Sequence, residues 1–145
     1  MKIIVDTNIV FSAILSSRGK TGELLLNKPT EVEYVSPSFQ LEELNSHAKK
    51  IIKLSGLNET EYQQIKAYVI QNIEFVNTDK ISAVYWMKAY DMIKDLVEKD
   101  IPFLALTMEL DGVLWTGDKK LVEALKNNQF NNTVSTYTIY KKYFG

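Results

Sequence analysis

The stretch Lys2-Ile3-Ile4-Val5-Asp6-Thr7-Asn8 decides the fold of the N-terminal half. Its apolar run predicts a short buried strand, and Thr7-Asn8 then open a helix that we expect to reach about Leu15. Asp6 follows the strand without an intervening loop. Ligands of open α/β sheets bind beyond the carboxyl ends of the strands, so Asp6 is a candidate site residue. The other interpretation of Asp6 is a helix N-cap.

A second predicted strand end also carries an acid. Residues 112–117 form a mostly apolar segment that ends directly at Asp118. Two carboxylates at two parallel strand ends are expected to converge on one crevice. Asp100 starts a helix that we expect to run to about Leu110, and it is a third candidate, again with helix capping as the alternative. We expect Asn8 and Thr116 to support these carboxylates.

The fourth candidate acid lies on a helix expected to extend from about Ser38 to Gly56. Glu42 and Glu43 are adjacent, so they point about 100° apart, and the spacing leaves open which of them flanks the apolar stripe. His47 lies one turn after Glu43 on the same face. It is the only histidine and therefore a conceivable acid–base group, although a lone histidine more often has a structural role.

The rest of the chain alternates strand-like and helix-like segments. Further strands are expected at residues 32–35, 73–76 and 133–138, and further helices at 21–26, after a capping box of Asn58 and Glu61, at 81–97, at 119–127 and around Tyr140 to Phe144. The apolar residues of the 81–97 segment fall on one face. Alternating elements imply parallel pairing through crossover helices. We therefore predict one domain over residues 1–145, a Rossmann-like, three-layer α/β/α sandwich with a small, mostly parallel sheet of four or five strands.

Composition narrows the class of protein. A length of 145 residues fits one domain, and the absence of cysteine excludes disulfides and thiolate metal sites. The N-terminal apolar run stops after three residues, unlike that of a signal peptide, and no segment approaches the roughly 18 uncharged residues of a membrane helix. We expect a cytoplasmic protein without membrane association. A net charge of −1 disfavours nucleic-acid binding through bulk charge, but it permits a local basic patch.

The candidate acids indicate a hard-cation site. Three aspartates and one of the two glutamates, with a single histidine and no cysteine, favour Mg²⁺ or Mn²⁺ over Zn²⁺. Such ions bind few carboxylates together with phosphate oxygens, and they promote phosphodiester hydrolysis. We expect the carboxylates to repel one another when no metal is bound.

Binding of a nucleic acid would require cations close to these acids. Lys119 and Lys120 follow Asp118 directly, and Arg18 and Lys20 lie in the loop after the first helix. Residues Lys49, Lys50 and Lys53 follow Glu43 on its helix, where a solvated helical face is an equally good interpretation.

Four short motifs, in order, resemble those of the PIN (PilT N-terminus) domain family. Asp6-Thr7-Asn8-Ile9 resembles the first, and residues 36–44 resemble the second, whose acid directly precedes an aliphatic residue, which selects Glu43 over Glu42. The segments that begin at Asp100 and at Trp115 resemble the third and fourth motifs. The resemblance extends from residue 3 to about residue 140. Related chains often carry another acid three residues before the third one, where this chain has Val97.

The resemblance implies a PIN-like fold and a Mg²⁺- or Mn²⁺-dependent endoribonuclease. It implies that Asp6, Glu43, Asp100 and Asp118 are the catalytic and metal-binding residues. The implied setting is a bacterial or archaeal toxin–antitoxin pair, with RNA, an antitoxin and a second copy of the chain as partners.

Two other functions are compatible with the sequence. The first is a catalytically weak PIN-like module that only binds RNA or a protein. The second is a phosphatase of the haloacid-dehalogenase type or a response-regulator domain. The phosphatase needs a second Asp where this chain has Asn8, and the response regulator needs a phospho-acceptor at a strand end in the middle of the chain, where none is evident.

Overall fold

The computed structural model describes all residues, 1–145, and contains one five-stranded sheet. Every neighbouring pair of strands is parallel, in the order β3-β2-β1-β4-β5. The strands are β1 (Lys2–Val5), β2 (Glu33–Pro37), β3 (Ile73–Val76), β4 (Val113–Trp115) and β5 (Thr133–Val134). The predicted α/β/α sandwich is confirmed, and its sheet is entirely parallel.

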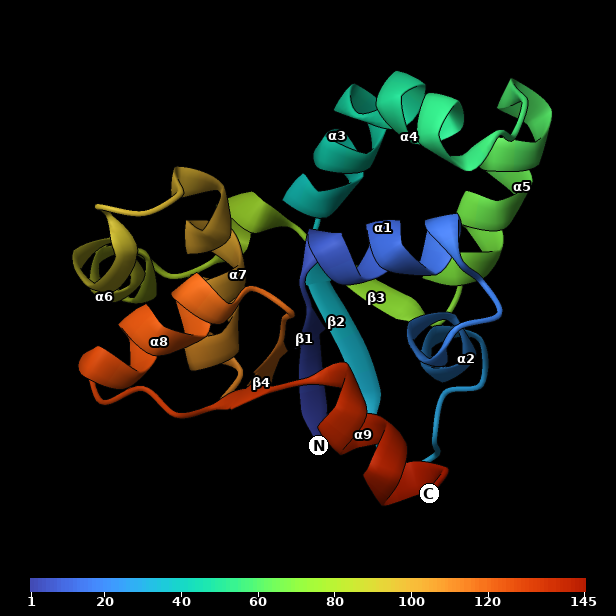
Figure 1. The fold of residues 1–145 in the computed structure, drawn as a ribbon. Helices are drawn as coiled ribbons and strands as arrows, with labels where there is room; N and C mark the ends of the chain where they lie inside the picture. Colours follow the sequence, from blue (N-terminus) through green and yellow to red (C-terminus); the bar gives the residue numbers. More distant parts are fainter.

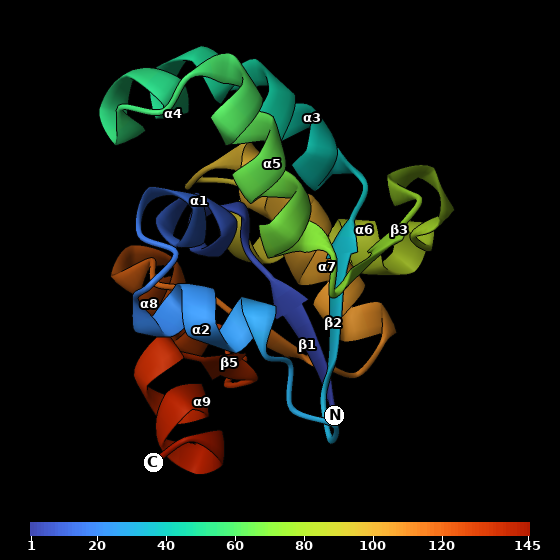
Figure 2. The same cartoon turned by 90° about the vertical axis from the view of Figure 1, so that its right-hand side faces the viewer.

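Helices cover both faces of the sheet (Figure 1). The α-helices are α1 (Thr7–Leu15), α2 (Lys20–Leu26), α3 (Phe39–Ser46), α4 (Ala48–Ser55), α5 (Glu59–Ile70), α6 (Ala83–Ile93), α7 (Ile101–Glu109), α8 (Lys119–Asn127) and α9 (Thr136–Tyr143), with short 3₁₀ turns η1 (Thr78–Lys80) and η2 (Glu98–Asp100). Helices α6, α7 and α8 lie on one side, and α1, α2 and α5 on the other. Both termini lie at the end of the molecule opposite α3 and α4 (Figures 1 and 2). None of the helices is both long enough and apolar enough to span a bilayer.

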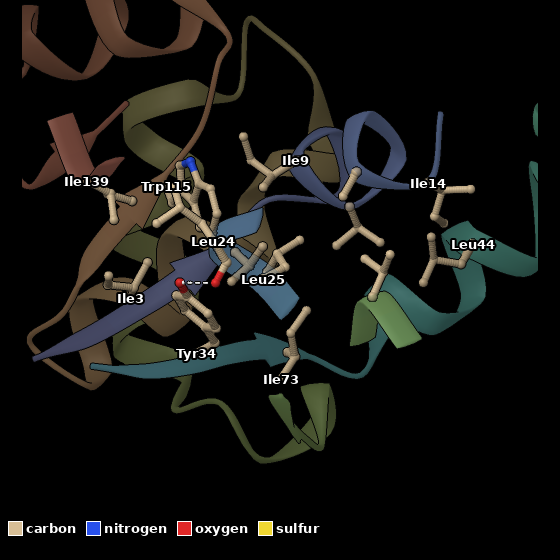
Figure 3. Packing of buried hydrophobic residues seen from close by; sticks show 14 of the residues in the cluster. Ile3, Ile9, Ile14, Leu24, Leu25, Tyr34, Leu44, Ile73, Trp115 and Ile139 are labelled. Atoms are coloured by element: carbon tan, nitrogen blue, oxygen red, sulfur yellow. Dashed lines mark hydrogen bonds between the residues drawn. The ribbon is translucent and has the colours of Figure 1, made fainter. Parts of the chain in front are cut away.

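The period-two pattern of the strands divides the core into two clusters, because successive strand side chains point to opposite faces. Ile3 and Tyr34 pack with α1, α2 and α5 in one cluster, whereas Ile4 and Val35 pack with α6, α7 and α8 in the other. Figure 3 shows the first cluster, in which the buried Tyr34 hydroxyl donates a hydrogen bond of 2.8 Å to the Leu24 carbonyl. The buried polar group of this large side chain is therefore satisfied.

Local sequence signals set two of the boundaries. The predicted capping box is confirmed at the start of α5, where Asn58 Oδ1 accepts from Glu61 N at 2.8 Å and Glu61 Oε1 accepts from Asn58 N at 3.0 Å. Gly112 leads from α7 into β4 beside β1. A Cβ atom at this position would lie 2.6 Å from Ile4 Cδ1 and 2.8 Å from the Lys2 carbonyl oxygen, so only glycine fits without movement of β1.

Three predicted element boundaries are wrong. The helix expected from Ser38 to Gly56 is two helices, because His47 leaves the helical region (φ −102°, ψ 7°) and separates α3 from α4. The strand expected at residues 133–138 ends at Val134, since Ser135 caps α9 by accepting from Thr138 N. The helix expected at 81–97 ends at Ile93.

The apolar face predicted for α6 is also mostly uncovered. Ile93 is buried, but the side chains of Met87 and Tyr90 are 68% and 51% exposed, and Val97, beyond the helix, is 50% exposed. Met87 and Tyr90 line a groove of about 810 Å³ together with Phe39 and Trp86. The hydrophobic periodicity showed which residues share one face of α6, but it did not show that this face is exposed to solvent.

The sheet order fixes where a ligand would bind. The chain leaves β1 toward β2 and β3 on one side and later returns to place β4 and β5 on the other. This reversal between β1 and β4 is a topological switch point, where α/β proteins bind ligands beyond the carboxyl ends of the strands. Asp6 and Asp118 follow these two strands.

Candidate active site

Asp6 is buried at the end of β1, where its side chain is 4% exposed. Its backbone N–H donates to the Trp115 carbonyl at 3.1 Å, so the pairing of β1 with β4 continues into the site. Asp6 occupies the N-cap position of α1, but its side chain makes no capping hydrogen bond. The carboxylate instead accepts from the Thr116 hydroxyl, at 2.8 Å from Oδ2. Its orientation is therefore set by the chain that follows β4.

Thr116 also connects Asp6 to the fourth acid. Its hydroxyl oxygen accepts from Asp118 N at 3.1 Å while it donates to Asp6. Asp118 Oδ1 in turn accepts from Lys120 N at 3.0 Å and Leu121 N at 3.2 Å, and so caps α8. Asp118 is thus both a helix cap and a residue that lines the crevice.

The structure distinguishes Glu43 from Glu42. Glu42 is exposed, whereas Glu43 is half-buried and faces the start of α1. The Thr7 hydroxyl donates a hydrogen bond of 2.6 Å to Glu43 Oε1. Thr7 and Thr116 hence hold one carboxylate each. The sequence indicated a supporting role for Thr116 but not for Thr7, whose only signal is its position directly after Asp6.

All four predicted acids line one cavity of about 220 Å³, which we call the acid cavity. Asn8 lines it as well, but without a side-chain hydrogen bond to a carboxylate. The lining consists of Asp6, Thr7, Asn8, Phe11, Glu43, His47, Val97, Lys99, Asp100 and Asp118. Four elements that are distant in sequence, namely β1–α1, α3, η2–α7 and β4–α8, therefore contribute carboxylates to one place.

Three carboxylates of the acid cavity, those of Asp6, Glu43 and Asp100, have a raised pKa. Burial raises the pKa of Asp6 to about 6, and the charges of Glu43 and Asp118 add to this, although the Thr116 hydroxyl lowers it. Burial raises the pKa of Asp100 to about 7, helped by repulsion from the other three acids. The pKa of Glu43 is also raised by burial, while Thr7 and the Lys99 charge lower it. Like charges confined together in this way favour a bound cation.

Two further side chains in the acid cavity differ in their relation to the carboxylates. Lys99 directly precedes Asp100 and lies close enough to Glu43 to lower its pKa. The sequence analysis missed Lys99, since its only signal was adjacency to a candidate acid. His47 lines the cavity but packs edge-on against the Phe11 ring, with centroids 5.6 Å apart. This packing is what a structural histidine would show.

The carboxylates fit a divalent cation by chemistry, since all are oxygen donors and no thiolate is present. They do not form a closed coordination sphere, because no three His, Asp or Glu side chains come close enough to hold an ion. Hydrogen bonds from Thr7, from Thr116 and from the α8 amides hold Glu43, Asp6 and Asp118 separately. An ion would have to draw these oxygens together.

The predicted RNA-binding lysines do not line the acid cavity. Lys119 lines a neighbouring cavity between α8 and α9, and the exposed Lys120 lines neither. Arg18 is exposed, whereas Lys20 Nζ lies 5.2 Å from the Tyr140 ring centroid. The three lysines on α4, Lys49, Lys50 and Lys53, are exposed. Among the lysine and arginine side chains, only Lys99 lines the acid cavity.

A parallel 3-2-1-4-5 sheet with a carboxylate-lined cavity at its switch point defines a Rossmann-like α/β protein with an acidic site. The sequence profile of the PIN domain matches residues 4–138. The chain therefore belongs to the PIN domain family, whose members are generally nucleases that use divalent metals. This membership leaves the phosphatase and response-regulator alternatives without support.

A solved structure has the same fold. A chain in the crystal structure of VapBC2 from Rickettsia felis bound to a DNA fragment from their promoter superimposes with a TM-score of 0.66 at 16% identity. The match covers 93% of this chain and 97% of that chain. No curated protein matches the sequence significantly.

Proposed function

We propose that this PIN domain is a Mg²⁺- or Mn²⁺-dependent endoribonuclease. The single observation that supports the proposal most strongly is the convergence of Asp6, Glu43, Asp100 and Asp118 in one cavity at the switch point. A bound divalent ion supplies positive charge that neutralises the scissile phosphate and activates water for in-line attack. The four carboxylates would hold it, since no other oxygen-rich cluster of side chains faces this cavity.

The residues of the chain would divide the remaining work. Thr116 and Thr7 fix one oxygen each of Asp6 and Glu43, which leaves the second oxygen of each carboxylate for the ion. Asp100, whose pKa is raised to about 7 while no ion is bound, would lose its proton when an ion binds and would then serve as a ligand. Lys99, at the same wall, would attract the phosphate into an otherwise acidic cavity.

Cleavage of a labelled single-stranded RNA tests this proposal. Glu43→Gln should lower the Mn²⁺-dependent rate at least about 100-fold. Loss of a residue that only supports a metal ligand lowers activity up to about 100-fold, and Glu43 is proposed to be a ligand itself. Glu42→Gln is the matched control, because Glu42 is the exposed neighbour on α3, and it should cleave at the wild-type rate. Cleavage that persists in EDTA, or equal rates for the two variants, would contradict the proposal.

We further propose that the chain is the toxin of a toxin–antitoxin pair, that it binds a cognate antitoxin and that it forms a homodimer. The support is the shared fold with a VapBC toxin–antitoxin complex. Three aromatic residues and one methionine, namely Phe39, Trp86, Tyr90 and Met87, line the open groove beside α6, and both residue types are enriched at protein interfaces. Expression of the chain alone should arrest growth, and Asp6→Asn should relieve the arrest. Normal growth with an active wild-type enzyme would contradict the toxin role.

One observation favours a catalytically weak binding module as a second candidate. The carboxylates do not approach one another closely enough to preform a metal site. A binding module would retain RNA in the presence of Mn²⁺ without cleaving it, and its affinity would not depend on Glu43. The cleavage assay above therefore separates the two functions.

A further inference from the structure

A second cavity, of about 660 Å³, adjoins the acid cavity between α8 and α9. We call it the α8/α9 cavity. Its lining includes Lys119, Glu123, Lys126, Ser135, Thr136 and Tyr137. The segment after β4 forms the junction between the two cavities, because Thr116 and Gly117 line the α8/α9 cavity and the next residue, Asp118, lines the acid cavity. The Thr116 hydroxyl, which donates to Asp6, lies at this junction.

The two cavities have opposite electrostatic character. Four carboxylates dominate the acid cavity, whereas two lysines, four hydroxyl-bearing residues and one glutamate line the α8/α9 cavity. The eight-residue helix α9 also begins there, at the Ser135 cap. The excess of positive charge favours an anion, and hydroxyl groups suit phosphate oxygens. The α8/α9 cavity is therefore complementary to a phosphate chain that leaves the acid cavity.

An exposed aromatic ring lines the α8/α9 cavity. Tyr137 is 63% exposed. Lys20 Nζ and Lys141 Nζ lie 5.9 Å and 6.0 Å from its ring centroid. An exposed aromatic ring with cations close by is the combination that single-strand binding proteins use, in which bases stack on aromatic rings and phosphates contact the cations.

We propose that the α8/α9 cavity is a single-stranded RNA subsite, in which Lys119 and Lys126 bind phosphates next to the scissile one and Tyr137 stacks an adjacent base. The inference rests on the proposed nuclease function, and it specifies the substrate. A base that stacks on Tyr137 must be unpaired, so the RNA is single-stranded along this path. The path runs from α8 to α9 and leaves out the α4 lysines.

Fluorescence anisotropy with labelled single-stranded RNA tests the subsite in an inactive Asp6→Asn background, with EDTA present. Each lysine–phosphate contact contributes about 0.7 to the slope of log affinity against log salt. Lys119→Ala with Lys126→Ala should therefore flatten the slope by about 1.4, so that over a tenfold rise in salt the parent protein loses about 25-fold more affinity than the variant. Lys50→Ala with Lys53→Ala on α4 removes the same charge and should leave the slope unchanged. Equal effects of the two pairs, or no effect of the first pair, would overturn the subsite.

Tyr137 is tested separately, because stacking depends little on salt. Tyr137→Ala should weaken single-stranded RNA binding at least about fivefold, and Tyr137→Phe should retain it. Binding of the same sequence as a duplex should not respond to Tyr137→Ala. A duplex that responds equally, or a Tyr137→Ala variant that binds the single strand normally, would overturn the stacking role. Unchanged thermal melting confirms that each exposed substitution leaves the fold intact.

These measurements do not depend on cleavage, so the two proposals fail independently. If wild-type protein binds RNA through the α8/α9 cavity but does not cleave it with Mn²⁺, the nuclease proposal fails and the subsite stands. If it cleaves RNA while the Lys119 and Lys126 variant binds normally, the subsite fails and the nuclease proposal stands.

Discussion

Asp6→Asn should stabilise the metal-free protein, and the gain should grow with pH. Burial raises the pKa of Asp6 from 3.8 to about 6, so the folded protein binds this proton more tightly than the unfolded chain does. Stability is therefore highest below the unfolded pKa and is lost as pH rises through the folded pKa. Asparagine has nearly the same shape, accepts the same hydrogen bond from Thr116 and carries no charge, so it avoids the loss.

The magnitude follows from the two pKa values. A difference between 3.8 and about 6 corresponds to about 3 kcal/mol of unfolding free energy at pH 8, where the carboxyl is ionised in both states. At pH 4.5 the folded carboxyl remains protonated, and the remaining cost is about 1 kcal/mol. Asp6→Asn should thus gain up to about 2 kcal/mol more at pH 8 than at pH 4.5.

Urea denaturation in EDTA at both pH values measures these gains. Asp95→Asn is the matched control, since Asp95 is exposed beyond α6 and its replacement should stay within about 0.5 kcal/mol at either pH. A gain for Asp6→Asn that is independent of pH, or a loss of stability at pH 8, would refute the electrostatic reasoning.

Three other predictions concern the metal, the hydroxyl at the junction and the packing of α2. Millimolar Mn²⁺ should raise the melting temperature of the wild type and should raise that of Asp6→Asn less. At an ion concentration of 100 times the dissociation constant, the stabilisation of the folded state is about 2.7 kcal/mol. Equal thermal shifts would argue against a site in the acid cavity. Thr116→Val removes the hydrogen bond that lowers the pKa of Asp6. In a plot of cleavage rate against pH, the rise on the acid side should therefore move to higher pH. If it does not move, ionisation of Asp6 is not what controls that rise. Gly22→Ala should cost about 1–3 kcal/mol in urea denaturation, because its Cβ would lie 2.3 Å from the Ser17 carbonyl oxygen; Gly19→Ala, at 3.3 Å from Ser16, is the milder control.

The elements of the fold were predictable where the pattern of apolar side chains is compatible with only one kind of secondary structure. The apolar run before Asp6 gave β1, and α1 and α8 have the predicted bounds. The break at His47 was not predictable, since His47 itself bonds to both helices: its N–H donates to Glu43 O at the end of α3, and its carbonyl accepts from Ile51 N at the start of α4. Hydrophobic periodicity shows which residues share one face of a helix. It does not show a break between two helices when the apolar positions continue at the same spacing on both sides.

The part of the candidate site that lies at the ends of strands was predictable. Asp6 and Asp118 could be placed from the order of strands and acids, because parallel strands present their carboxyl ends at one edge. The contacts that orient these acids could not be placed. Thr7 meets Glu43 across 36 residues, and Thr116 meets Asp6 across 110. Such hydroxyls are common in every sequence, and only the folded chain shows which of them reach a carboxylate.

The net charge of the whole chain hides the local positive charge on which the proposed RNA binding depends. The value of −1 includes the four carboxylates of the acid cavity, so the rest of the chain carries +3. Cations bound in the cavity would offset those carboxylates and leave the lysines around the α8/α9 cavity as the dominant local charge. Metal binding and RNA binding then reinforce each other, because the same ions that complete the site remove the repulsion that keeps a phosphate out of it.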